Sequence, residues 1–96
     1  MIRHTVAFKL KHAEGSAEEQ EFLSDALALA NIPTVKKFER LKQVSSKNKF
    51  THGLSMEFDD QPAYQAYNVH PVHVAFVKDR WMKEVTDFME TDYVAL

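Results

Sequence analysis

The chain has 96 residues, of which 45% are hydrophobic, with a formal net charge of −2 and no cysteine. A chain of this size and composition is typical of one globular domain, so we expect residues 1–96 to form a single domain. The charge argues against nucleic-acid binding, which depends on a basic face, and no apolar run approaches the roughly 18 residues of a membrane span. The N-terminal segment alternates and carries charges, unlike a signal peptide, so we expect a cytoplasmic protein.

The first half of the chain predicts a strand, a helix and a second strand. Residues 2–10 alternate between apolar and polar, which is the strand period. Ser16 and Glu19 have capping-box spacing, and an apolar stripe from Ala17 to Ala30 predicts an amphipathic helix. Residues 35–44 predict the second strand, although lysines on both faces make its alternation less regular.

The second half predicts two strands with helical segments between them. Residues 50–58 alternate again, and Asp59 or Asp60 can cap a short helix that carries Tyr64 and Tyr67 on one side. That helix should end near Val69, because the residue before a proline leaves the helical conformation, and the proline at position 71 should begin a new helix. Residues 85–94 predict the last strand.

This order predicts the α+β class and a ferredoxin-like βαββαβ fold with a four-stranded antiparallel sheet. The helices can cover only one face of such a sheet. The other face therefore needs a partner, for which a second copy of the chain is the simplest choice, so we expect a homodimer.

The histidines permit both a structural and a functional interpretation. His4 and His52 lie on the apolar faces of their strands, where each is either a core histidine held by a hydrogen bond or part of a site. His12 follows the first strand in a charged stretch and is expected to be solvated.

The segment YNVHPVHVAF raises the same choice. The first turn of a helix favours neutral imidazole, so His73 could act as a general base. If the chain bends at His70, the Tyr67 phenol could reach the same cavity and donate a hydrogen bond to a developing oxyanion. The alternative is a helix begun by proline with incidental histidines. A metal site is not predicted, because there is no cysteine or local carboxylate to complete one.

Two acids in the last strand share the parity of an apolar residue. If Phe88 faces the core, then Glu90 and Asp92 face the same way and need partners, for which histidine is suitable. A slipped register or a frayed strand end is the alternative.

Four segments, IRHTVAFKLK, FTHGLSMEF, YNVHPVHVAFV and TDYV, resemble the stress-responsive A/B barrel (Dabb) domain family in the expected order. The resemblance implies a homodimer in which two four-stranded sheets form one α+β barrel with the helices outside. It also implies a pocket between sheet and helices in each subunit.

Because the family includes a plant polyketide cyclase, the resemblance implies that Tyr67 and His73 form a catalytic pair for an aldol condensation that uses no cofactor. It also implies that Asp92 belongs to the substrate-binding site and orients the base. Ala26 and Glu90 depart from the family pattern. The further residues that the resemblance assigns to substrate binding are His4, Val6, Phe8, His52, Leu54, Met56, His70 and Phe76.

We therefore expect a Dabb protein of unassigned role that binds a small aromatic or polyketide-like molecule, without nucleic acid, membrane, metal or cofactor. The alternative is a cofactor-independent, cyclase-like enzyme that uses Tyr67 and His73 for proton abstraction. A purely structural barrel is a third option, and a monooxygenase-like dimeric barrel is a distant one.

Overall fold

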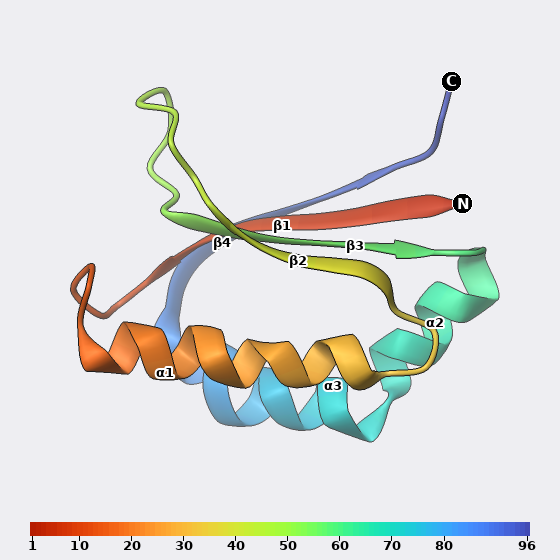
Figure 1. The fold of residues 1–96 in the computed structure, drawn as a ribbon, viewed down its shortest axis with the longest axis horizontal. Helices are drawn as coiled ribbons and strands as arrows, with labels where there is room; N and C mark the ends of the chain where they lie inside the picture. The colour runs from red at the N-terminus through yellow and green to blue at the C-terminus, as the bar shows by residue number, and fades with distance from the viewer.

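The structure is a computed structural model that describes residues 1–96, and its core is an antiparallel sheet of four strands (Figure 1). The strands are β1 (Ile2–Leu10), β2 (Lys36–Lys42), β3 (His52–Phe58) and β4 (Val85–Tyr93), in the spatial order β2-β3-β1-β4. The ferredoxin-like βαββαβ prediction is confirmed. The predicted strands at 35–44, 50–58 and 85–94 are each slightly too long.

The pairing register puts the predicted apolar residues on one face of the sheet. Val6 pairs with Leu54 on one side and with Glu90 on the other, while Phe8 pairs with Phe88. Phe88, Glu90 and Asp92 therefore share the inward face, and the alternative of a slipped register is wrong for this stretch of β4.

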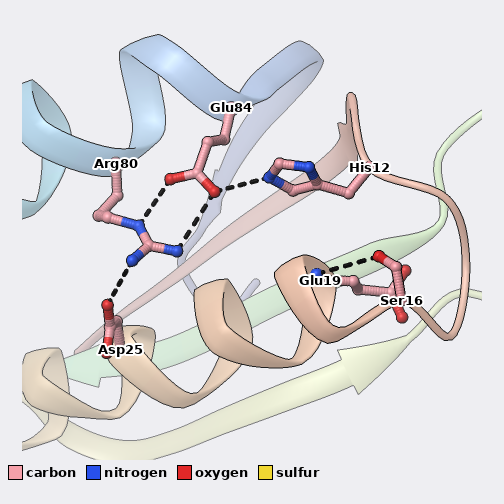
Figure 2. Close-up of polar contacts among 6 residues, drawn as sticks. All are labelled: His12, Ser16, Glu19, Asp25, Arg80 and Glu84. Carbon is pink, nitrogen blue, oxygen red and sulfur yellow. Dashed lines mark hydrogen bonds and ion pairs between the residues drawn. The ribbon is translucent and has the colours of Figure 1, made fainter.

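The first helical region is α1 (Ala17–Asp25), which continues as the 3₁₀ segment η1 (Ala26–Asn31). The Ser16 hydroxyl accepts a hydrogen bond from the Glu19 N–H at 3.2 Å, as a capping box requires (Figure 2). The Glu19 carboxylate accepts from the N–H of Gly15 at 3.1 Å, one residue earlier than in the standard box. Gly15 has φ of +79°, which places this donor in a left-handed turn.

The second helical region begins with α2 (Gln61–Val69), whose N-terminus is capped by Asp60 through the Ala63 N–H at 2.9 Å. A new helix begins at Pro71, as predicted, and consists of α3 (Pro71–Phe76), the π-helical segment η2 (Val77–Trp81) and α4 (Met82–Glu84). No helix is both long enough and apolar enough to cross a bilayer.

The helices pack against a single face of the sheet, and Figure 1 shows them all below it. The core between the two layers contains fully buried side chains from β1, β3, α1 and η1, of which the largest are Phe8, Phe22, Phe58, Leu29 and Met56. The opposite face is uncovered. A row of outward residues crosses all four strands there, namely Leu41, Gly53, Ala7 and Met89.

A polar network joins the helical layer to the end of β1 (Figure 2). Glu84 lies 2.7 Å from His12 Nε2 and 2.6 Å from Arg80 Nε, and Arg80 also contacts Asp25 at 2.6 Å. The expectation of a solvated His12 is wrong, because the His12 imidazole contacts Glu84 of α4 and is only 15% exposed.

Candidate functional site

A cavity of about 520 Å³ lies between the sheet and the helices. Twelve of its sixteen lining residues are hydrophobic, so it has the size and character of a site for a small organic molecule. The sheet contributes His4, Val6, Leu54, Met56, Val85, Phe88 and Glu90, and the helical layer contributes Leu29, Tyr64, Tyr67, Asn68, His73, Phe76, Val77, Trp81 and Met82.

Tyr67 and His73 both line this cavity, although they belong to different helices. The chain bends between α2 and α3 at His70, and the two rings come together with centroids 4.3 Å apart. Tyr67 is buried and has no hydrogen-bond partner on its hydroxyl within the chain, so that group is free to bind a ligand. Burial, followed by the charge of Glu90, raises the pKa of Tyr67, which remains a neutral hydrogen-bond donor at pH 7.

The two ring nitrogens of His73 have different environments. Nδ1 lies 3.0 Å from the backbone carbonyl of Asn68 near the end of α2, so Nδ1–H donates and Nε2 keeps its lone pair. Burial lowers the pKa of His73, the Asn68 carbonyl opposes this shift, and the proximity of His4 lowers the pKa further. His73 is therefore neutral at pH 7, as predicted, but burial is the largest cause.

A second polar cluster lies beside Tyr67 and His73, and its members His4 and Tyr64 line the cavity. Asp92 lies 2.6 Å from His4 Nδ1, and the Tyr64 hydroxyl lies 2.8 Å from the same nitrogen and donates to Asp92 at 3.0 Å. Burial and the contact with Asp92 raise the pKa of Tyr64. Tyr64 was not predicted to belong to the site, although its position one helical turn before Tyr67 was a usable signal.

Asp92 does not orient His73. It pairs directly across the strands with His4, and that register brings its carboxylate to the His4 ring instead. Asp92 therefore holds and orients His4, and not His73 as the resemblance implied.

Four of the predicted substrate-binding residues do not line the cavity, namely Phe8, His52, His70 and Asp92. Phe8 and His52 stack on each other at 5.8 Å further along the sheet, where Phe8 packs under Phe22 of α1. His70 caps α3, because its Nδ1 accepts from the N–H of Val72 at 3.1 Å. The remaining predicted wall residues do line the cavity: His4, Val6, Leu54, Met56 and Phe76.

Comparison with known proteins agrees with this architecture. The family model of the stress responsive A/B barrel domain (Dabb) matches residues 2–95. The chain is a member of the Dabb family. The family resemblance predicted from the sequence is therefore confirmed.

Relatives of this Dabb chain include an enzyme and proteins of solved structure. The chain is 33% identical to olivetolic acid cyclase of Cannabis sativa over 79 residues, which are 78% of each protein. A Dabb protein with a ferredoxin-like fold from Mesorhizobium loti is 57% identical, with a TM-score of 0.98 and coverage of 99% of this chain and 96% of that one. A dimeric ferredoxin-like protein of unknown function from Bacteroides fragilis is 25% identical, with a TM-score of 0.74 and coverage of 98% and 95%.

Proposed function

We propose that this Dabb protein binds a small, mainly apolar organic molecule that carries a carbonyl group. The observation that supports the proposal is the apolar cavity of about 520 Å³ into which the free Tyr67 hydroxyl and a neutral His73 open. A cavity of this kind buries an aromatic or polyketide-like skeleton while a few polar groups orient it.

The test is a titration with a panel of aromatic ketones and β-keto compounds, followed by a crystal structure of the tightest complex. We expect saturable binding of one molecule per chain, with density in contact with Tyr67 and His73. Absence of saturable binding across the panel, or a complex with the ligand elsewhere, would contradict the proposal.

A second candidate function is proton abstraction next to a carbonyl, as in the cyclase relative. It is favoured by the 4.3 Å approach of the Tyr67 and His73 rings and by the unprotonated Nε2. In this step the α-carbon–hydrogen bond breaks, the proton moves to His73 Nε2 and the electron pair forms an enolate. The Tyr67 hydroxyl donates a hydrogen bond to the enolate oxygen, and the step as written uses no cofactor.

Exchange of ketone α-protons for deuterium, followed by NMR in D₂O, measures this step without knowledge of the natural substrate. Replacing the base should lower the enzyme-dependent rate by about 100-fold or more in His73→Ala. Tyr67→Phe should lower it by about 10- to 100-fold. Both variants should keep the wild-type circular dichroism spectrum. A rate unchanged in His73→Ala would exclude His73 as the base, and loss of folding would indicate an architectural role.

We also propose that two copies associate through the uncovered sheet face. A hollow of about 270 Å³ lies on that face between Leu41 and Met89, with the small residues Ala7 and Gly53 beneath it. Leu41 and Met89 are 46% and 53% exposed, which is a high value for apolar side chains on a sheet face. The Bacteroides fragilis relative is dimeric.

A location in the cytoplasm stays a prediction from the sequence.

A further inference from the structure

The cavity contains no fixed positive charge. None of its sixteen lining residues is lysine or arginine, and its only carboxylate is that of Glu90. His73 does not compensate at pH 7, because burial lowers its pKa. The electrostatic potential that a ligand meets is therefore neutral to negative.

Glu90 lies on the edge strand β4, directly opposite Val6 of the cavity wall. Its side chain is exposed, and it forms no hydrogen bond or ion pair with any residue of the chain. Asp92, two residues later on the same face, differs in this respect because His4 and Tyr64 hold it. Glu90 is thus the unpaired charge at the open side of the cavity.

The charge of Glu90 acts on the groups inside the cavity. After burial, it is the remaining cause of the raised pKa of Tyr67, and it also opposes the lowering of the pKa of His73. A carboxylate that influences both groups is close enough to influence a ligand bound between them.

We propose that Glu90 determines the charge of the ligand: the cavity accepts carbonyl compounds that are uncharged or carry a protonated amine, and it rejects carboxylates. This inference rests on the proposed binding function and narrows its ligand class. A ligand carboxylate would lose water on entering an apolar cavity and would face Glu90 without a cation to compensate. A ligand ammonium group at the same position would form an ion pair with Glu90.

The experiment compares three ligands of one shape: 2-acetylnaphthalene, its 6-aminomethyl derivative and its 6-carboxylate. Their dissociation constants are measured at pH 7.5 by fluorescence with the wild-type protein and with Glu90→Gln. Glu21→Gln is the matched control, since Glu21 is exposed on α1, has no partner and does not line the cavity. It changes the net charge by the same amount.

In the wild type the amine should bind about tenfold or more tightly than the carboxylate, as expected for one partly screened charge pair. Glu90→Gln should reduce this ratio about fivefold or more and change the affinity of 2-acetylnaphthalene less than about twofold. Glu21→Gln should leave the ratio at its wild-type value.

Two other outcomes are distinguishable. If 2-acetylnaphthalene binds but the carboxylate binds as tightly as the amine, or if Glu90→Gln leaves their ratio unchanged, the assignment to Glu90 is overturned while the binding function stands. If none of the three ligands binds saturably, the result counts against the binding function itself, and the charge selection is lost with it.

Discussion

The protonation state of His73 determines the pH range in which the proposed base can act. Its Nδ1–H is held by Asn68 and its Nε2 is free, so only the neutral ring can accept a substrate proton. Burial lowers its pKa from the ordinary value of 6.5, and the ring is consequently neutral at pH 7 and above.

This shift predicts the pH profile of deuterium exchange. The rate should be constant from about pH 7 to pH 9 and fall in acid, with a midpoint below 6.5, because the base is lost as His73 becomes protonated. No alkaline decrease should appear in this range, since the pKa of Tyr67 is raised above its ordinary value of 10.0. Initial rates followed by NMR across this range provide the measurement. A midpoint above 7 would show that another group titrates.

Tyr64 stabilises the fold by its hydrogen bonds to His4 and Asp92. Tyr64→Phe should lower the free energy of unfolding by about 1 kcal/mol, a modest value because Asp92 is 40% exposed and can regain water. Urea denaturation measures the change. Tyr93→Phe is the control, since Tyr93 is exposed and its hydroxyl has no partner, and it should lose less than about 0.5 kcal/mol. Equal losses in the two variants would show that these hydrogen bonds contribute nothing.

At the residue scale, features within one strand could be predicted, but contacts between residues far apart in the sequence could not. The parity of Phe88, Glu90 and Asp92 follows from a period of two and needs no structure. The partner of Asp92 is decided by the pairing of β1 with β4, eighty-eight residues apart at His4, and alternation within one strand does not specify that register. For the same reason the contact of His12 with Glu84 could not be foreseen.

At the element scale, the Glu84 network fixes α4 against the end of β1 and, through Arg80, against α1. Burial raises the pKa of Glu84, but the hydrogen bonds from His12 and Arg80 outweigh it, and the net pKa lies below the ordinary 4.5. A carboxylate with a lowered folded-state pKa stabilises the fold above its unfolded pKa, and this contribution is lost as the pH falls through the folded value.

Replacing this acid should therefore have a pH-dependent effect. Glu84→Gln should lower the free energy of unfolding by about 2 kcal/mol at pH 7, because Arg80 and His12 lose a largely buried partner. The difference from wild type should decrease once the pH falls below 4.5. Urea denaturation at pH 7 and pH 4 tests this, with Glu21→Gln as the exposed control. A difference that is constant with pH would show that the charge of Glu84 is not the cause.

The strand that was least clear in the sequence is also irregular in the structure. The register of β2 shifts between Lys36 and Glu39, and Lys37 has φ of +50° within this bulge. Its side chain forms an ion pair with Glu57 at 3.6 Å. A bulge changes the parity of the residues that follow, so Lys36, opposite Glu57, and Lys42, opposite His52, lie on different faces, although a regular strand would place both on one face.

At the scale of the whole molecule, the uncovered face predicts the assembly. Met89→Arg should convert the proposed dimer into a monomer, because a charge would replace an exposed apolar side chain within the proposed contact. Light scattering after size exclusion measures the mass. Val74→Arg is the control, since Val74 is 51% exposed on the helical layer, and it should remain dimeric. A monomeric wild-type protein would contradict the proposal, as would dissociation of both variants.

The layered architecture was predictable because helices that cover one face of a sheet leave the other face uncovered. The row of Ala7, Gly53, Leu41 and Met89 lies on that uncovered face. The cavity was less predictable. Its volume depends on how far η2 and α4 stand from β4, and Trp81 and Met82 acquire their lining positions through a π-helical turn that no sequence period specifies.

Successive residues of β4 point in opposite directions, with Phe88 and Glu90 toward the cavity and Met89 and Thr91 toward the open face. The same strand thus forms part of the cavity wall on one side and part of the open sheet face on the other. A single-residue insertion early in this strand would place methionine where an acid meets the ligand and glutamate where another sheet would pack, and a deletion would place Thr91 where the acid meets the ligand. Natural variation in β4 should consequently proceed by substitution alone, with the length of the strand held constant.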